Sequence, residues 1–340
     1  MTTDALRIVA DPAWHAHRIN AAMTEIYFVR IDREQHRAVT FLEDKYLSPE
    51  LERATLPFAA VEAAVASFDH AAPRFIFHSS MATSTLLTRI FDAPGASMSL
   101  AEPIILNELA TLKRRRVDVR RALAVVLKLL GRPFAEGEKV VVKPGNTANI
   151  LIPEIAAALP ELRALIIEAP IRTYLRSVAK KGIFGRTVYR RLYALLSRDR
   201  DLKTGFTPED VFEQTDLQIA AMAWLHHRCE FVEACRAFPA AFVTLDSAAF
   251  LAEKEATLHA LSRHFDIALD VPAIMAGPIF KRHSKEIGRD FDERQRDVEH
   301  EQAQAAHGEE IDMVAQWLAA VATHVGLPET LPAALSLRSV

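Results

Sequence analysis

Hydroxyl side chains gather directly after a short apolar run in residues 74–87, RFIFHSSMATSTLL. The apolar run ends abruptly, serine and threonine residues follow, and an apolar, helix-like pattern resumes. A strand, a tight loop and a helix in this order present backbone N–H groups and a helix N-terminus to an anion. The stretch therefore predicts an anion-binding loop from His78 to Thr85. Of the usual loop GxxxxGK[ST] only Thr85 remains, because His78 and Thr83 stand at the glycine positions and Ser84 at the lysine.

Two further charged residues follow other short β-like runs. Glu102 comes after residues 97–100, and Lys143 ends the β-branched run 139–142. Since the carboxyl ends of parallel strands meet at one sheet edge, we expect Lys143 near the loop at His78. A carboxylate at that edge can contact a ligand, but Glu102 also precedes a proline that can open a helix, where the helix dipole favours an acid.

Basic residues cluster at two later points of the chain. Arg172 and Arg176 lie one turn apart on a helix predicted to begin near Pro170, so they can either clamp a phosphate or pair with acids at the surface. The run 278–285, PIFKRHSK, is a cationic loop that either folds over a bound anion or forms a solvated turn.

The elements that must position these residues alternate between strand and helix. Apolar and β-branched runs predict strands that begin at Arg74 and that span 97–100, 139–142, 163–167 and 241–245. The stretches between them have helical spacing or helix-opening prolines. This alternation predicts an α/β fold with a central parallel sheet flanked by helices, joined by right-handed crossovers.

We expect the chain to have three segments. Residues 1–72 are predicted to form an N-terminal extension packed on the core, with an alanine-rich helix from Pro49 to Phe68. Residues 73–300 form the α/β domain, and residues 301–340 form a last helix and a frayed tail. The segment from Gly182 to Arg200 is rich in arginine and tyrosine, and we interpret it as a lid or a substrate-facing segment.

The bulk properties of this 340-residue chain narrow the function classes. A formal net charge of −3 excludes bulk attraction to nucleic acid or an anionic membrane as the main activity. With two cysteines, no leader pattern and no apolar run of membrane-spanning length, we expect a cytoplasmic protein without an integral membrane segment. No complete set of metal ligands is evident, so no metal is expected. A homo-oligomer is compatible with these properties.

The succession of these stretches resembles the sulfotransferase family. From Phe75 to Lys285 the chain contains, in order, FHSSMATSTLL, SLAEP, VVVKPGN, ALIIEAPIRTYLRSV, FVTLDSAAFLAEKEATLHALSRHF and FKRHSK. The resemblance implies a P-loop-like three-layer sandwich with helical additions. It also implies transfer of a sulfuryl group from 3′-phosphoadenosine 5′-phosphosulfate (PAPS) to a hydroxyl or amine acceptor. Whether the acceptor is a small molecule or a modified protein is left open.

The resemblance also implies roles for individual residues. Glu102 matches the general base of the family, and Lys143 and His283 are the candidates to replace cations that the loop has lost. The residues expected to hold PAPS belong to the loop, to the segment after the predicted strand 163–167 and to the late basic loop. They are His78, Ser79, Ser80, Met81, Ala82, Thr83, Ser84, Thr85, Arg172, Arg176, Ser177, Lys281 and Arg282.

Single positions depart from the family pattern and keep two alternatives open. Met81 stands where the family has a lysine or arginine, Thr83 where it has a glycine, and Glu168 where it has an arginine. The first alternative is therefore a non-catalytic nucleotide- or anion-binding protein of the same fold. The second is an ATP-dependent small-molecule kinase, in which the Thr85 hydroxyl and a carboxylate of Asp246 or Glu168 would hold magnesium.

Overall fold

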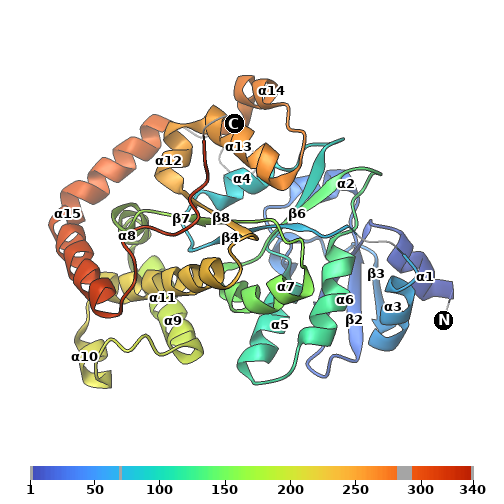
Figure 1. The fold of residues 1–340 in the computed structure, drawn as a ribbon, viewed down its shortest axis with the longest axis horizontal. Helices are drawn as coiled ribbons and strands as arrows, with labels where there is room; N and C mark the ends of the chain where they lie inside the picture. The colour runs from blue at the N-terminus through green and yellow to red at the C-terminus, as the bar shows by residue number, and fades with distance from the viewer. Residues whose placement is uncertain (1–2, 69–70, 282–292, 338–340) are drawn as a thin grey trace.

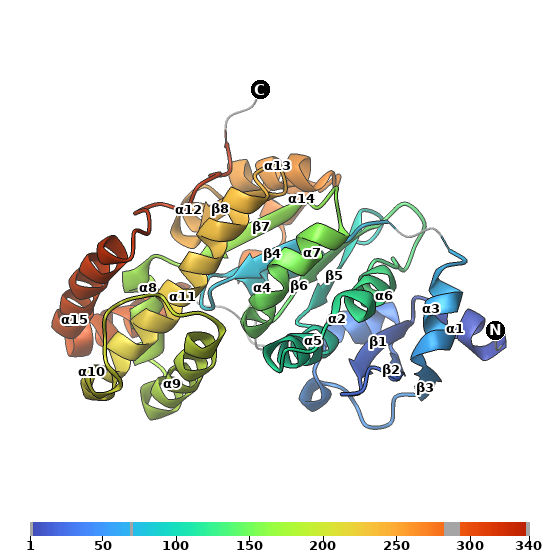
Figure 2. The same cartoon turned by 60° about the horizontal axis from the view of Figure 1, so that its bottom comes forward.

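The computed structural model describes residues 3–68, 71–281 and 293–337. Its centre is a five-stranded parallel sheet with the strand order β5-β6-β4-β7-β8 (Figures 1 and 2). The strands are β4 Arg74–His78, β5 Ser97–Ala101, β6 Lys139–Lys143, β7 Ala164–Glu168 and β8 Phe242–Asp246. The predicted parallel sheet is confirmed, and the ends of the strands lie within one residue of their predicted places.

The sheet is covered on both faces. In β7, Ala164 and Ile166 belong to one hydrophobic core, whereas Leu165 and Ile167 belong to another. Successive side chains of a strand point to opposite faces, so these two cores lie on opposite sides of the sheet. Because all four side chains are fully buried, each face must be covered by helices. The architecture is a three-layer α/β sandwich.

The helices divide between these two cores. The first core contains residues of α1 Thr3–Ala10, α3 Phe58–Val65, α5 Ile104–Arg114, α6 Arg120–Leu130 and α7 Ile152–Ala158. The second core contains residues of α4 Ser84–Ile90, α8 Ile171–Ala179, α9 Gly182–Asp199, α12 Ser247–Ala252, α13 Lys254–Phe265, α14 Val271–Ala276 and α15 Glu293–His324. The long helix α11 Asp216–Ala237 contributes to both cores. Helices α2 Arg33–Ala38 and α10 Pro208–Glu213 are short. Helix α15 lies at the opposite end of the molecule from α1 (Figures 1 and 2).

An antiparallel sheet that the sequence did not predict lies in the N-terminal segment. It consists of β1 Trp14–Ile19, β2 Glu25–Arg30 and β3 Arg53–Pro57, in that order. The predicted helix from Pro49 to Phe68 was wrong in its first part, because Leu56 of β3 pairs with Ile26 of β2 and α3 begins only at Phe58. Cross-strand packing with β2 outweighs the local helical preference of these residues.

Arg132 ties the N-terminal segment to the rest of the molecule. Its guanidinium donates to the carbonyl oxygens of Val9 at 2.7 Å and Trp14 at 2.6 Å. Burial lowers the pKa of Arg132 to about 10. The carbonyl acceptors offset part of the cost of burying its charge. The segment also shares one continuous hydrophobic core with a face of the parallel sheet.

Residues 333–335 lie alongside β8. The N–H of Thr244 donates to the carbonyl of Ala333, and the N–H of Leu335 donates to the carbonyl of Thr244, both at 2.8 Å. The prediction of a frayed tail was therefore wrong for these residues. In the described part of the chain, no helix combines the length and apolarity needed to cross a membrane.

Candidate functional site

The loop between β4 and α4 has a left-handed backbone at several positions. Ser80, Met81 and Thr83 have φ angles of +73°, +53° and +62°. L-residues avoid this region, and a β-branched residue such as Thr83 avoids it most strongly. Thr83 is also the residue that stands at a glycine position of the P-loop pattern, so the structure keeps the turn that this glycine would make. Strain of this kind persists where the surrounding structure enforces it, often at ligand sites.

The backbone N–H groups of this loop are largely free. Within the described chain, no acceptor receives a hydrogen bond from the N–H groups of residues 81–85. The hydroxyl groups of Ser84 and Thr85 also lack a described partner, although both residues are 95% buried. The loop therefore presents a row of unused donors at the start of α4, which is the arrangement that holds an anion in a phosphate-binding loop.

His78 and two asparagines hold the loop in place. The N–H of Ser80 donates to Nδ1 of His78 at 3.1 Å, so Nε2 carries the proton and donates to the carbonyl of Pro144, also at 3.1 Å. Nδ2 of Asn149 donates to the carbonyl of His78 at 3.1 Å, and Nδ2 of Asn146 donates to Ser80 Oγ at 2.7 Å. Both asparagines lie in the 3₁₀ helix η2 Asn146–Leu151, which follows β6.

His227 and Tyr189 complete this network, and the sequence analysis assigned neither of them to the site. The two ring nitrogens of His227 each lie 3.3 Å from the amide nitrogen of one of the two asparagines. Tyr189 of α9 hydrogen-bonds to Ser80, and burial raises the pKa of its phenol. The turn residues after β6 were a visible sequence signal for Asn146. No local pattern distinguished His227, which is fully buried in α11.

Glu102 and Lys143 form an ion pair at the neighbouring strand ends. The buried Nζ of Lys143 contacts Oε1 of Glu102 and lies 5.1 Å from the centre of the Phe41 ring. The N–H of Glu102 also donates to the carbonyl of Lys143 at 2.7 Å, and Glu102 has a left-handed φ of +51°. His78 donates a hydrogen bond to the carbonyl of Pro144, the residue that follows Lys143, so the expected proximity of Lys143 to the loop is confirmed.

A small cavity lies beside α4 and β5, and neither Glu102 nor Lys143 lines it. It has a volume of about 30 Å³ and is lined by Thr85 of the loop and by Ala101, the residue before Glu102. The side chain of Glu102 remains 19% exposed, and only one of its oxygens is engaged by Lys143. The second oxygen of Glu102 is therefore available to a ligand.

The residues expected at the 3′-phosphate lie on α8, and only one of them has an uncommitted side chain. Arg172 donates to Asp312 of α15 at 2.6 Å, and the Ser177 hydroxyl donates to the carbonyl of Thr173 at 2.9 Å. Arg176 has a buried Nε without a hydrogen-bond partner, and no acid of the described residues pairs with its guanidinium. Arg176 is therefore the candidate phosphate ligand on this helix.

Glu168, at the end of β7, is neutralised within the fold. Its Oε2 accepts from Nη1 of Arg228 at 2.6 Å, and Arg228 also donates to the carbonyl of Pro328 at 3.2 Å. Burial raises the pKa of Glu168 to about 8, with Arg228 opposing the shift. A carboxylate at this position would repel a phosphate, and the raised pKa of Glu168 together with the charge of Arg228 reduces that repulsion.

The late basic loop is described only at its beginning. Arg282 and His283 lie outside the described residues, and Lys281 is the last residue of the 3₁₀ helix η3 Pro278–Lys281. Helix η3 packs against α4. The chain therefore enters this basic segment beside the helix that follows the anion-binding loop.

The carboxylates that the kinase alternative needs are already engaged. Asp246 caps α12 by accepting from the N–H groups of Ala248 and Ala249, and Glu168 is paired with Arg228. Over the described ranges, no group of three or more histidine, cysteine or acidic residues is arranged to hold a metal ion. No observation in this part of the chain favours magnesium-dependent phosphoryl transfer.

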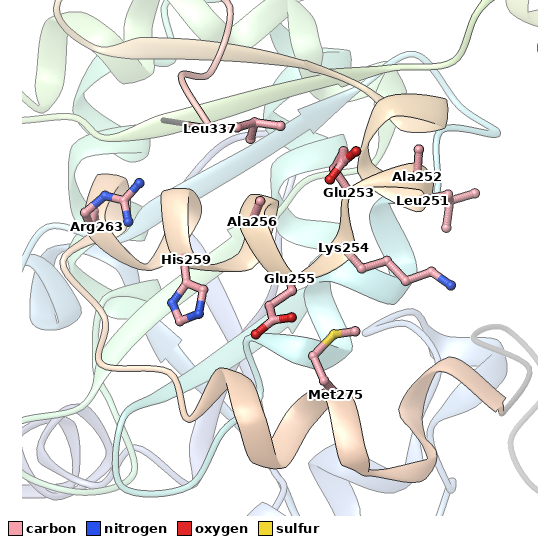
Figure 3. A pocket seen from close by; sticks show the side chains of 10 residues that line it. All are labelled: Leu251, Ala252, Glu253, Lys254, Glu255, Ala256, His259, Arg263, Met275 and Leu337. Carbon is pink, nitrogen blue, oxygen red and sulfur yellow. The ribbon is translucent and has the colours of Figure 1, made fainter. Parts of the chain in front are cut away.

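Two larger concavities differ in character. One, of about 290 Å³, opens beside the loop between Ser80, Asn146 and α9. The other, of about 740 Å³, lies along α13 and α14, where Glu255 and His259 point toward α14 (Figure 3). The second concavity shares no lining residue with the loop and is lined by exposed charged residues. Ligand sites combine apolar walls with a few convergent polar groups, so the concavity beside the loop is the better candidate.

The strain at Thr83 gives a first prediction. Thr83→Gly is expected to raise the free energy of unfolding by about 1 kcal/mol. Glycine removes the penalty of about 1–2 kcal/mol for the left-handed backbone, but it also increases the conformational entropy of the unfolded chain, which offsets part of this stabilisation. Chemical denaturation of both proteins measures the change. The control is Thr85→Gly, two residues on in α4, which should destabilise the fold. A loss of stability in Thr83→Gly would show that the Thr83 side chain supports the loop.

Comparisons with known proteins give limited similarity. No protein-family model and no curated protein sequence matches the chain. Among solved structures, the fold is similar to a sulfotransferase domain from the curacin biosynthetic pathway, with 10% sequence identity and a TM-score of 0.40. The match covers 71% of this chain and 99% of that domain. At this level of similarity, function has to be argued from the residues of the chain itself.

Proposed function

We propose that the chain is a sulfotransferase-like protein that binds the phosphosulfate end of PAPS at the loop from His78 to Thr85. The observation that carries this proposal is the row of free N–H groups at residues 81–85, on a loop whose left-handed Ser80 is held by His78 and Asn146. A rigid loop of unused donors pays little to bind an oxyanion, because its groups are already oriented.

Two groups of residues would suit the two charged ends of PAPS. The free N–H groups and the hydroxyls of Ser84 and Thr85 suit the 5′ end, and the uncommitted Arg176 suits the 3′-phosphate. When bound, PAPS supplies a sulfuryl group attached to a phosphate leaving group. The loop would hold and neutralise that end, which is the role that the missing lysine has in other phosphate-binding loops.

Glu102 is the residue proposed to act on the acceptor. Its free oxygen would take the proton of an acceptor hydroxyl or amine as that group reacts, and its other oxygen stays on Lys143. Lys143 is a positioning residue, because its fully buried side chain contacts Glu102 and Phe41. This assignment gives the buried ion pair a function beyond stability, to which such pairs contribute little.

Nucleotide binding tests the cofactor assignment without requiring an acceptor. Adenosine 3′,5′-bisphosphate is expected to bind the full chain in calorimetry and, at one hundred times its Kd, to stabilise it by about 2.7 kcal/mol. Arg176→Ala should weaken binding by about ten- to a hundredfold, because a charge-assisted hydrogen bond is lost. Arg172→Ala is the matched control on the same helix and should change Kd less than about twofold, since Arg172 is held by Asp312.

Two results would contradict this assignment. The first is the absence of heat and of a thermal shift with the bisphosphate at millimolar concentration. The second is an equal loss of affinity in Arg172→Ala and Arg176→Ala, which would indicate a general charge effect instead of a phosphate contact.

A non-catalytic anion-binding protein of the same fold is the second candidate. It is favoured by the pairing of Lys143 with Glu102, which engages the Lys143 ammonium, and by Met81 at the position of the family's basic residue. The two candidates differ in turnover. Bisphosphate binding without transfer of label from PAPS to any of a panel of hydroxyl and amine acceptors would favour the second.

A further inference from the structure

The cavity of about 290 Å³ beside the loop has one polar and one apolar side. Ser80 and Asn146 form the polar side, next to the proposed sulfuryl site. Val188, Leu192 and Leu195 of α9 form the apolar wall. A volume near the lower end of the usual range for ligand sites suits a small molecule.

The apolar wall continues along α9 to the surface. Phe184, Val188, Leu192 and Leu195 follow at intervals of four, four and three residues, so they lie on one face of the helix. The exposed fraction falls from 75% at Phe184 through 40% at Val188 to 8% at Leu192. The stripe therefore leads from solvent into the cavity, and an apolar chain lying along it would be removed from water.

Arg191 supplies an uncommitted charge at the same cavity. Its neighbours Arg186 and Arg190 on α9 both pair with Asp216 of α11. Arg191 lines the cavity, is exposed, and has no acid or hydrogen-bond acceptor among the residues that the structure describes. A guanidinium beside an apolar stripe is complementary to a molecule that joins an apolar chain to an anionic group.

We propose that this cavity binds the acceptor and that the acceptor is a small amphipathic acid, with its apolar chain on the α9 stripe and its carboxylate on Arg191. The group that receives the sulfuryl faces the polar side, at Ser80 and Asn146. Calling this ligand the acceptor rests on the proposed function, whereas its binding to the cavity does not. An amine in place of the carboxylate would be repelled by Arg191.

Octanoate, octan-1-ol and octylamine are matched probes for this assignment, because they share the chain and differ in the charge of the head group. In calorimetry with the full chain at neutral pH, octanoate is expected to bind about three- to tenfold more tightly than octanol, and octylamine the least tightly. Arg191→Gln should remove the preference for octanoate over octanol. Arg198→Gln, an exposed arginine of the same helix that does not line the cavity, should keep it.

The stripe is tested separately. Val188→Ser should weaken octanoate and octanol alike by several-fold, whereas Ile183→Ser, which is 84% exposed and outside the lining, should not. Equal binding of octanoate and octylamine, or an unchanged preference in Arg191→Gln, would overturn the proposal. If octanoate binds and the bisphosphate does not, only the proposed function is contradicted. If the bisphosphate binds and octanoate does not, only the proposed class of acceptor is contradicted.

Discussion

Glu102→Gln is expected to lower kcat for sulfuryl transfer by about 10²–10⁴, the usual contribution of a general base. Glutamine has nearly the same shape and keeps an oxygen that can accept from Lys143, so the fold should tolerate it. It has no carboxylate to take the acceptor proton. The measurement is transfer of label from PAPS to hydroxyl acceptors, with the amphipathic acids of the α9 cavity tested first.

The controls separate chemistry from binding and folding. Glu62→Gln removes an acid of α3 that pairs with Arg121 of α6 and is assigned to no part of the site, and it should leave kcat unchanged. The affinity of Glu102→Gln for adenosine 3′,5′-bisphosphate should stay within about twofold of the wild-type chain, since Glu102 is not assigned to the nucleotide. Full transfer activity in Glu102→Gln would exclude this residue as the base and would leave the Glu102–Lys143 pair with a structural role.

The sequence predicts the parallel sheet well for a physical reason. Its strands are buried on both faces and therefore appear as short continuous apolar runs, such as residues 140–142 (VVV) before Lys143 and residues 164–167 (ALII) before Glu168. The loop is predicted for a related reason. Where small hydroxyl residues separate a strand from a helix, few local structures other than a tight loop can connect the two. The left-handed backbone at Thr83 falls at a glycine position of the pattern, but the sequence analysis did not predict it.

The features that the sequence does not predict depend on contacts between distant residues. Strand β3 is stabilised by pairing with β2, and its own residues carry no strong β pattern. The sequence predicts Arg172 as a phosphate ligand, whereas in the fold it pairs with Asp312, which lies 140 residues later in the chain. From the sequence, the carboxylate of Glu168 would repel a phosphate, whereas in the fold it pairs with Arg228 of α11. Charged residues have several possible partners, and the fold decides among them.

Glu168 should make the stability of the folded chain fall as the pH rises from about 5 to about 8. Burial raises its folded pKa from 4.5 to about 8, so in this interval the folded state keeps a proton that the unfolded state releases. Below this interval both states are protonated and nothing is lost. Above it the full cost is present, up to about 5 kcal/mol if the shift is fully expressed.

The difference between the wild-type chain and Glu168→Gln isolates this effect. Burial lowers the pKa of His36 and His226 to about 4, which makes stability rise with pH over part of the same range, but this contribution is common to both proteins. Urea denaturation at several pH values should therefore show that the free energy of unfolding of Glu168→Gln increases relative to that of the wild-type chain as the pH rises.

Arg228→Met should make the fall in stability with rising pH larger than in the wild-type chain, because it removes the charge that opposes the pKa shift of Glu168. It also leaves the Pro328 carbonyl without the hydrogen bond from Arg228. A constant difference between pH 5 and 8.5 would mean that Glu168 stays ionised beside Arg228, and the pair would then be an ordinary buried salt bridge that fixes the C-terminal segment.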